Sequence, residues 1–272
     1  FAQLRAYVRQ RERLLEYAAS HIQHMQKALT EMNLQLHHVV ADITGGTGLR
    51  IIRAILSGEH NPKTLAGLRD YRCHASTGTI EKALTGNYRA EHLFALEQAL
   101  ALYEAYHEKV SACDTRIEAV LKELSIGRGH KADSLPSSRR RADQVNALAF
   151  DVRSALFALL GKDITRIDGF GPYLSLKLIA ECGDNLSAWP SAKHFTSWLG
   201  LAPNNKISGG RVLSSRTRRS GGRAAALLRL AAVTVGRTET ALGAFYRRLS
   251  ARIGKAKAVT ATARKIAVLF YN

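Results

Sequence analysis

Two runs of apolar residues, repeating at intervals of three and four, constrain the fold more than any other feature of this sequence. Such spacing places the apolar side chains along one seam of an α-helix, and helices with a seven-residue repeat pack as coiled coils. In the first run Arg11 interrupts the apolar series. The heptad positions of that run are Val8, Leu15, Ile22, Leu29 and Leu36.

The second run fills two heptad positions. We expect both runs to form long helices, so that residues 1–124 make a coiled-coil, helical oligomerisation region in a mainly α-helical protein. The pattern leaves open whether the seams pair within one chain or with another subunit. The first heptad position of the second run is filled by Leu96, Tyr103, Val110, Ile117 and Leu124. Its second heptad position is filled by Ala99, Tyr106, Cys113 and Val120.

A glycine-rich turn lies between the two runs. Gly45, Gly46 and Gly48 precede an apolar segment at 49–56, which predicts a turn that enters a helix. Gly58 is expected to end this helix, and Pro62 to begin the next. A cap on the coiled coil is the favoured interpretation, and contact of the glycines with phosphate is the alternative.

Residues 125–143 read as a flexible basic linker, because glycines, serines, a proline and an arginine triplet occur there without periodicity. A C-terminal domain, 144–272, is expected to follow. It should begin with an apolar helix near Gln144 that runs through Ala147, Phe150, Val152, Leu156 and Leu160.

The positive charge is concentrated at the end of the chain. The net charge is +18, and residues 185–272 hold sixteen lysines and arginines against a single acid, Glu239. This asymmetry indicates a nucleic-acid surface. An anionic membrane surface is the competing interpretation, but no uninterrupted basic amphipathic helix is evident, and no apolar run approaches the roughly 20 residues that span a bilayer.

The three cysteines, Cys73, Cys113 and Cys182, lie far apart in the sequence. Their spacing fits neither a disulfide framework nor a zinc site. A reducing cytoplasm is therefore expected.

Residues 164–184 have the pattern of a helix-hairpin-helix. Ile167 precedes a Gly169-Phe170-Gly171 hairpin, after which an apolar helix carrying Lys177 is expected. Glycines let the backbone turn sharply and approach a phosphate, which can then meet N–H groups at a helix N-terminus. Such contacts grip the nucleic-acid backbone without reading bases. An ordinary helix hairpin is the alternative.

Residues 203–223 form a basic loop rich in serine and glycine. Ser208 is followed by Gly209 and Gly210, which leave room for a phosphodiester beside the main chain. Transesterification at phosphorus needs a positioned hydroxyl and cations that neutralise the growing charge, a task that suits arginine. The candidate cations are Lys206, Arg211, Arg216, Arg218, Arg219 and Arg223.

The run from "IDGFGPYLSLKLIAECGD" through "WPSAKHFTSWLGLAPNNKISGGRVLSSRTRRSGGR" to "ALGAFYRRLSARIGKAKAVTATARKIA" resembles the C-terminal domain of the DEDD transposases of bacterial insertion sequences. These transposases make up the one-ten family, which includes the eleven-eleven group, and they are related to the Piv invertase. The resemblance is closest to the eleven-eleven group and extends back through "HIQHMQKALTEMNLQLHHVVADITG".

The resemblance implies a DNA transposase or recombinase that acts on donor and target DNA in the bacterial cytoplasm, at the nucleoid. It implies Ser208 as the nucleophile, with Ser214 and Ser215 as the alternatives. It also implies a dimer or tetramer and a noncoding guide RNA.

The same resemblance implies Mg²⁺ bound by four acids of an N-terminal RuvC-like domain. No such set is visible in this sequence, and Asp42, Asp70 and Asp114 lie in other contexts. Because the chain begins with Phe1 and ends at "VLFYN", we expect a preceding segment and an end short of that usual in the family. A noncatalytic DNA- and RNA-binding scaffold is the alternative function.

Overall fold

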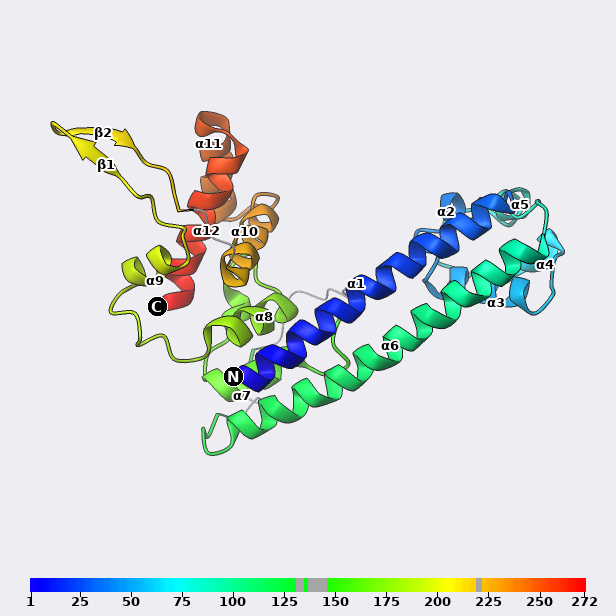
Figure 1. Cartoon of the computed structure of the whole chain (residues 1–272), viewed down its shortest axis with the longest axis horizontal. Helices are drawn as coiled ribbons and strands as arrows, with labels where there is room; N and C mark the ends of the chain where they lie inside the picture. The colour runs from blue at the N-terminus through cyan, green and yellow to red at the C-terminus, as the bar shows by residue number, and fades with distance from the viewer. Residues whose placement is uncertain (131–134, 137–145, 219–221) are drawn as a thin grey trace. The chain divides into compact units, whose positions relative to one another are not determined.

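The computed structural model describes residues 1–130, 135–136, 146–218 and 222–272 and is mainly helical, which confirms the expected fold class (Figure 1). The chain divides into two compact units. The coiled-coil unit is Gln10–Ala112, and the C-terminal unit combines Phe1–Arg9 with Cys113–Asn272. Most of the expected linker, 125–143, lies outside the described residues.

Two long helices, α1 (Ala2–Glu31) and α6 (Ala90–Ser125), contribute to both units. Within the coiled-coil unit they pair in antiparallel fashion in one chain. Tyr17 lies 5.7 Å from Tyr106 between ring centroids, and Glu31 Oε2 lies 3.2 Å from His92 Nδ1. The two apolar seams therefore meet each other, and self-association through them remains a prediction.

Arg11, which interrupts the apolar series, lies on the seam of α1 and is fully buried. Burial, together with the Arg11 guanidinium, lowers the pKa of His107 on α6. The first seam is also shorter than expected. The helix α1 ends at Glu31, Asn33 adopts a positive φ of 58°, and Leu36 belongs to the next helix.

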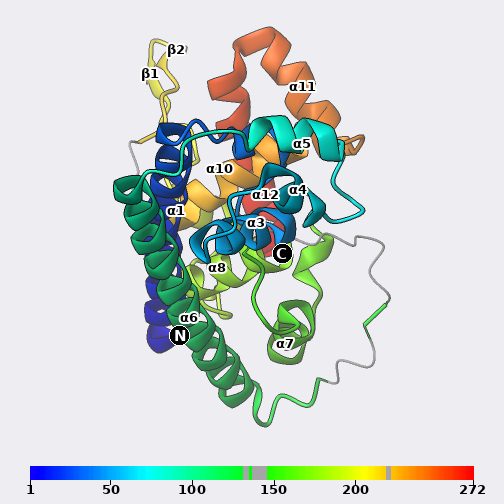
Figure 2. The ribbon, with the colours of Figure 1, turned by 90° about the vertical axis from the view of Figure 1, so that its right-hand side faces the viewer.

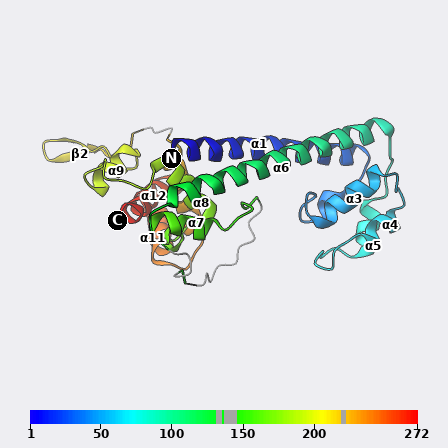
Figure 3. The same ribbon diagram turned by 90° about the horizontal axis from the view of Figure 1, so that it is seen from below.

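Four short helices cover one end of this unit (Figure 3). Gly48 lies in the first turn of α3, where a Cβ would come within 2.1 Å of the Ile43 carbonyl oxygen. A glycine at position 48 is therefore needed for close packing of the cap. Asn61 caps the helix that begins at Pro62, as expected from the proline. The helices are α2 (Leu36–Val39), α3 (Gly46–Leu56), α4 (Pro62–Gly67) and α5 (Thr77–Ala83).

The C-terminal unit contains most of the remaining elements. Its main core lies where α10 and α12 pack together through alanine-rich faces, with α8 and α9 beside them. The small side chains let the helices approach closely. The elements are α7 (Val152–Leu160), η2 (Ile164–Arg166), α8 (Pro172–Cys182), α9 (Ala192–Trp198), β1 (Lys206–Ser208), β2 (Arg211–Ser214), α10 (Arg223–Val235), α11 (Ala241–Ile253) and α12 (Lys255–Tyr271).

A second core in this unit joins the first turns of α1 and the last turns of α6 to α7 and α8. Arg5 donates hydrogen bonds to the carbonyl oxygens of Ala180 and Glu181 at the end of α8, at 2.8 and 3.0 Å. Arg9 makes a two-pronged ion pair with the Glu181 carboxylate, at 2.8 and 2.6 Å. These contacts fix the C-terminus of α8.

The expected start of the apolar helix near Gln144 is wrong among the described residues. The helix α7 begins at Val152, because Asp151 accepts hydrogen bonds from the N–H groups of Arg153 and Ser154 and so caps it. Ala147 and Phe150 precede this cap in non-helical backbone.

Candidate nucleic-acid interface

The predicted basic loop contains a β-hairpin. Its strands β1 and β2 are antiparallel and are joined by Gly209 and Gly210, which adopt positive φ values of 55° and 74°. Positive φ at both central residues is the requirement of a type I′ turn, whose twist matches that of paired strands. A Cβ added at either glycine would meet no atom within 4 Å. The backbone at the turn is therefore open on its outer side.

Ser208 lies at the exposed tip of this hairpin, next to the turn. It is paired in register with Arg211, the first residue after the turn. Cross-strand neighbours at such positions lie close enough for their side chains to interact. Ser208 is exposed, and among the described residues none forms a hydrogen bond with its hydroxyl.

The chain below the tip is held to the C-terminal unit. Leu201 is buried, and the N–H groups of Leu201 and Ala202 both donate to the Thr196 carbonyl oxygen in α9. Pro203 bridges Thr217 across the hairpin base. A rigid helical support thus carries a short exposed ribbon.

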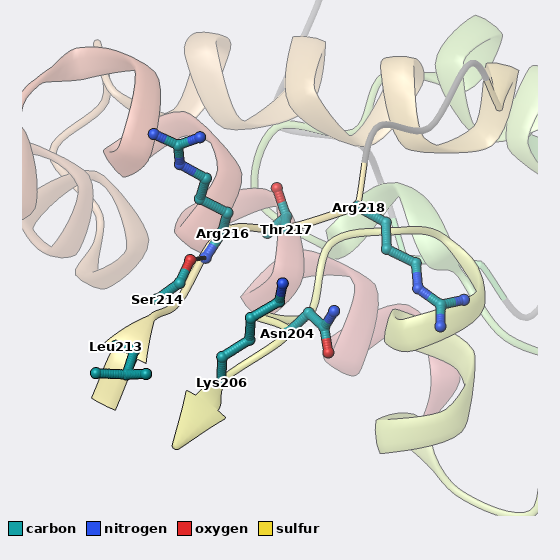
Figure 4. Close-up of a pocket in the computed structure, with 7 residues that line it drawn as sticks. All are labelled: Asn204, Lys206, Leu213, Ser214, Arg216, Thr217 and Arg218. Carbon is teal, nitrogen blue, oxygen red and sulfur yellow. Dashed lines mark hydrogen bonds between the residues drawn. The ribbon is translucent and has the colours of Figure 1, made fainter. Parts of the chain in front are cut away.

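A hollow of about 500 Å³ lies at the hairpin base (Figure 4). Ser214 lines it, and its Oγ accepts a hydrogen bond of 3.4 Å from the Arg216 N–H. Figure 4 shows the Arg216 and Arg218 side chains extending in opposite directions from the chain that carries them. The lining residues are Asn204, Lys206, Leu213, Ser214, Arg216, Thr217 and Arg218.

The hairpin thus separates two groups of predicted site residues. Ser208, Gly209, Gly210 and Arg211 lie at the tip, whereas the cations at 206, 216 and 218 gather at the base with Ser214. The side chains of Lys206, Arg211, Arg216 and Arg218 are exposed, and no acid in the described part of the chain forms an ion pair with them. Uncompensated charge of this kind attracts a polyanion.

Two other predicted cations differ from these four. Arg223 begins α10, and its Nε lies 3.5 Å from a Glu181 carboxylate oxygen, so part of its charge is used within the protein. Arg219 lies outside the described residues.

The predicted helix-hairpin-helix occupies η2, the glycine turn and α8. Gly169 has a φ of 86°, and a Cβ there would lie 2.6 Å from Val235 Cγ2 and 2.7 Å from the Ala231 carbonyl oxygen. Close packing against α10 therefore requires this glycine. Gly171 precedes Pro172 at the start of α8, and the Lys177 ammonium lies 4.6 Å from the centre of the Tyr173 ring. Contact of this element with phosphate remains a prediction.

The strand pairing, and with it the base hollow, was missed by the sequence reasoning. Asn204, Leu213 and Thr217 line the hollow but were not singled out. The signal was present, since Ile207 and Val212 flank a Gly-Gly pair that favours a two-residue hairpin turn.

The described residues do not fit a metal ion of the kind that the resemblance implies. No group of three or more histidines, cysteines, aspartates or glutamates among them could hold one. The acids noted in the sequence have structural partners: Asp42 accepts from Thr44, Asp70 pairs with Arg72, and Asp114 accepts from the Ala149 N–H.

Comparison with known protein families gives a match over part of the chain. Residues 161–247, which include α8, the hairpin and α10, match the model of the family described as Transposase IS116/IS110/IS902. This match supports the broad transposase family and a transposase or recombinase role. No curated protein and no solved structure matches the chain. Within the described ranges, no helix has the length and apolarity to cross a membrane.

Proposed function

We propose that this protein is a DNA transposase or recombinase of an insertion sequence, and that its β1–β2 hairpin presents Ser208 to a DNA phosphodiester. One observation carries the proposal. Ser208 lies at the open tip of an exposed basic hairpin, and this hairpin lies inside the segment that matches the transposase family.

The Ser208 hydroxyl is the attacking group in this mechanism. Its Oγ forms a bond to phosphorus while the bond from phosphorus to one sugar oxygen breaks. The hydroxyl proton passes to solvent water, and the departing sugar oxygen takes up a proton from water to become a free hydroxyl. The DNA strand is then held as a phosphoserine ester until a sugar hydroxyl of the exchanged strand attacks the phosphorus and restores Ser208.

The hairpin cations stabilise the charge that grows on the nonbridging oxygens during this step. Arg211 is the nearest candidate, because it is paired with Ser208 across the turn. Its planar guanidinium can hold two phosphate oxygens at once. Lys206, Arg216 and Arg218 at the base are proposed to bind the flanking strand, which is supported by the lack of neutralising acids in the described chain.

Other parts of the proposal concern partners. The family resemblance favours donor and target DNA, a noncoding guide RNA, assembly as a dimer or tetramer, and action in the bacterial cytoplasm at the nucleoid. It also implies Mg²⁺ at acids of a RuvC-like domain. Because the described residues do not fit this ion, the step above uses only the hydroxyl and cations of this chain together with solvent water.

Covalent adducts test the proposal. The protein as it occurs in the cell, supplied with Mg²⁺ and the RNA of its insertion sequence, is incubated with labelled DNA carrying the element's junctions, and adducts that resist detergent are counted. We expect Ser208→Ala to abolish the adduct and to leave DNA affinity within about twofold, because an exposed hydroxyl contributes little to binding. Ser214→Ala and Ser215→Ala serve as matched controls that retain the adduct.

Two outcomes would contradict the proposal in different ways. An adduct that persists in Ser208→Ala would show that another residue is the nucleophile. If the wild-type protein binds DNA but never forms an adduct, the protein is a noncatalytic nucleic-acid-binding scaffold.

A further inference from the structure

The junction between α11 and α12 carries a second cluster of exposed cations, separate from the hairpin. Every residue from 251 to 257 is exposed. This junction and the last two turns of α11 hold Arg248, Arg252, Lys255 and Lys257, all of them exposed, and we call these four side chains the basic tip.

The charge of the basic tip is uncompensated. The sequence contains no acid from residue 240 to its end at 272, and no acid in the described part of the chain pairs with these four side chains. Neighbouring cations differ. Arg247 donates to the carbonyl oxygen of Thr238 at 2.7 Å, and Lys265 lies 4.7 Å from the centre of the Phe245 ring. Those two side chains support the local fold, whereas the basic tip makes no comparable contact with the residues that the structure describes.

The backbone between these cations is easy to approach. Ala251, Gly254 and Ala256 are exposed and have little or no side chain, and a Cβ at Gly254 would meet nothing within 4 Å. No acid lies in the first turn of α12. The partial positive charge of that helix end therefore adds to the side-chain charges.

We infer that the basic tip is a binding site for the phosphate backbone of duplex DNA, an inference that rests on the proposed function. A single-stranded ligand is disfavoured, because stacking of bases requires exposed aromatic rings, and the tip has none. A membrane surface is disfavoured too, because Ile253, 38% exposed, is the only large apolar side chain exposed at the tip.

The tip and the hairpin belong to the same compact unit. Figures 1 and 2 both show α11 and the β1–β2 hairpin extending toward the same side of that unit, upward in each view. The basic tip and the hairpin therefore belong to elements that extend to the same side of this unit.

Salt-dependent binding tests the inference. The affinity of the protein for a 30-base-pair duplex DNA is measured by fluorescence anisotropy from about 50 to 300 mM KCl. The tip variant carries Arg248→Gln, Arg252→Gln, Lys255→Gln and Lys257→Gln. The control variant carries Lys27→Gln, Lys63→Gln, Lys82→Gln and Lys109→Gln, which remove the same charge from exposed positions of the coiled-coil unit.

The tip variant should weaken DNA binding by more than about tenfold near 150 mM salt. It should also lower the magnitude of the slope of log K against log salt by about 3.6, since each of the four phosphate contacts contributes about 0.9. The control variant should keep the wild-type slope to within about 0.5. Circular dichroism should show equal helix content and melting for all three proteins, because the substituted side chains are exposed.

Equal slopes for the tip and control variants would overturn the inference and leave the proposed function standing. A wild-type protein that binds no duplex at all would instead contradict the proposed function. A parallel titration uses duplex RNA of the same length, and a loss confined to RNA would overturn the assignment to DNA.

Discussion

Asp163 connects two elements of the C-terminal unit through a single carboxylate. One oxygen accepts a hydrogen bond from the Thr165 N–H at the start of η2, and the other lies 2.6 Å from an Arg153 guanidinium nitrogen of α7. Burial acts to raise the pKa of Asp163, but the hydrogen bonds from Arg153 and Thr165 outweigh it and lower the pKa. The folded state therefore favours the ionised carboxylate.

Asp163→Asn should lower the free energy of unfolding by about 2–3 kcal/mol at pH 7, because it leaves Arg153 largely buried without its counter-charge. Since the folded pKa lies below the unfolded value near 3.9, the stabilisation is present above that value and is lost as pH falls toward the folded pKa. Urea unfolding at pH 7 and pH 3 should thus show a smaller acid-induced loss in Asp163→Asn than in wild type.

The exposed pair of Glu108 and Lys109 provides the control for this prediction. Glu108→Gln should change stability by less than about 1 kcal/mol, as is usual for surface ion pairs. Equal losses in the two variants would show that Asp163 has no special role.

The environment of Cys182 disfavours this thiol as a nucleophile. Burial, followed by the neighbouring Glu181 carboxylate, raises the pKa of its thiol to about 12. A thiol with such a pKa is protonated at neutral pH and is a poor nucleophile. Ser208, by contrast, is exposed at the hairpin tip.

At the scale of elements, the turn between η2 and α8 depends on a helix far along the chain. Gly169 has both a positive φ and close contacts with Ala231 and Val235 of α10. Gly183, at the other end of α8, has a similar φ of 80° but open space around it. A comparison of substitutions at the two glycines therefore separates the cost of backbone strain from the cost of steric clash.

We predict that Gly169→Ala destabilises the protein by about 3 kcal/mol or more, because the new methyl group clashes with α10 in addition to the strain of a left-handed backbone. Gly183→Ala should cost less, about 1–3 kcal/mol, because its φ of 80° and ψ of −176° are strained for a residue with a side chain but its surroundings are open. Thermal unfolding of the two variants measures the difference. Equal shifts would contradict the packing role of Gly169.

The elements differ in how far their sequence could predict them. The heptad seams identified both long helices, because the apolar period persists over many turns. The start of α7 was misplaced, since apolar residues at 147 and 150 precede the cap at Asp151. The strands of the hairpin have three and four residues, too few to establish a period, and the close packing around Gly169 depends on residues more than sixty positions later.

The candidate site, like the elements, could be predicted from the sequence only where local residues determine it. The serine, glycines and arginines of the hairpin could be named from local sequence, but the separation of tip from base follows from strand register. The basic tip at 248–257 was not singled out, because its four cations become one surface only when α11 and α12 meet.

For the whole molecule, the two units divide the charge sharply. The coiled-coil unit, Gln10–Ala112, contains eleven lysines and arginines and eleven acids, so the entire net charge of +18 belongs to the C-terminal unit. A neutral coiled coil suits contacts between protein helices, and a strongly basic unit suits DNA. This division agrees with a protein that assembles through one unit and binds DNA with the other.

Mapping the covalent adduct tests the role of Ser208 most directly. Trypsin cleaves after Lys206, Arg211 and Arg216, so Ser208 falls in the peptide 207–211, and Ser214 and Ser215 fall in 212–216. After nuclease and trypsin digestion of the adduct, mass spectrometry should find the residual nucleotide on 207–211. A nucleotide on 212–216, or on any other peptide, would contradict attack by Ser208.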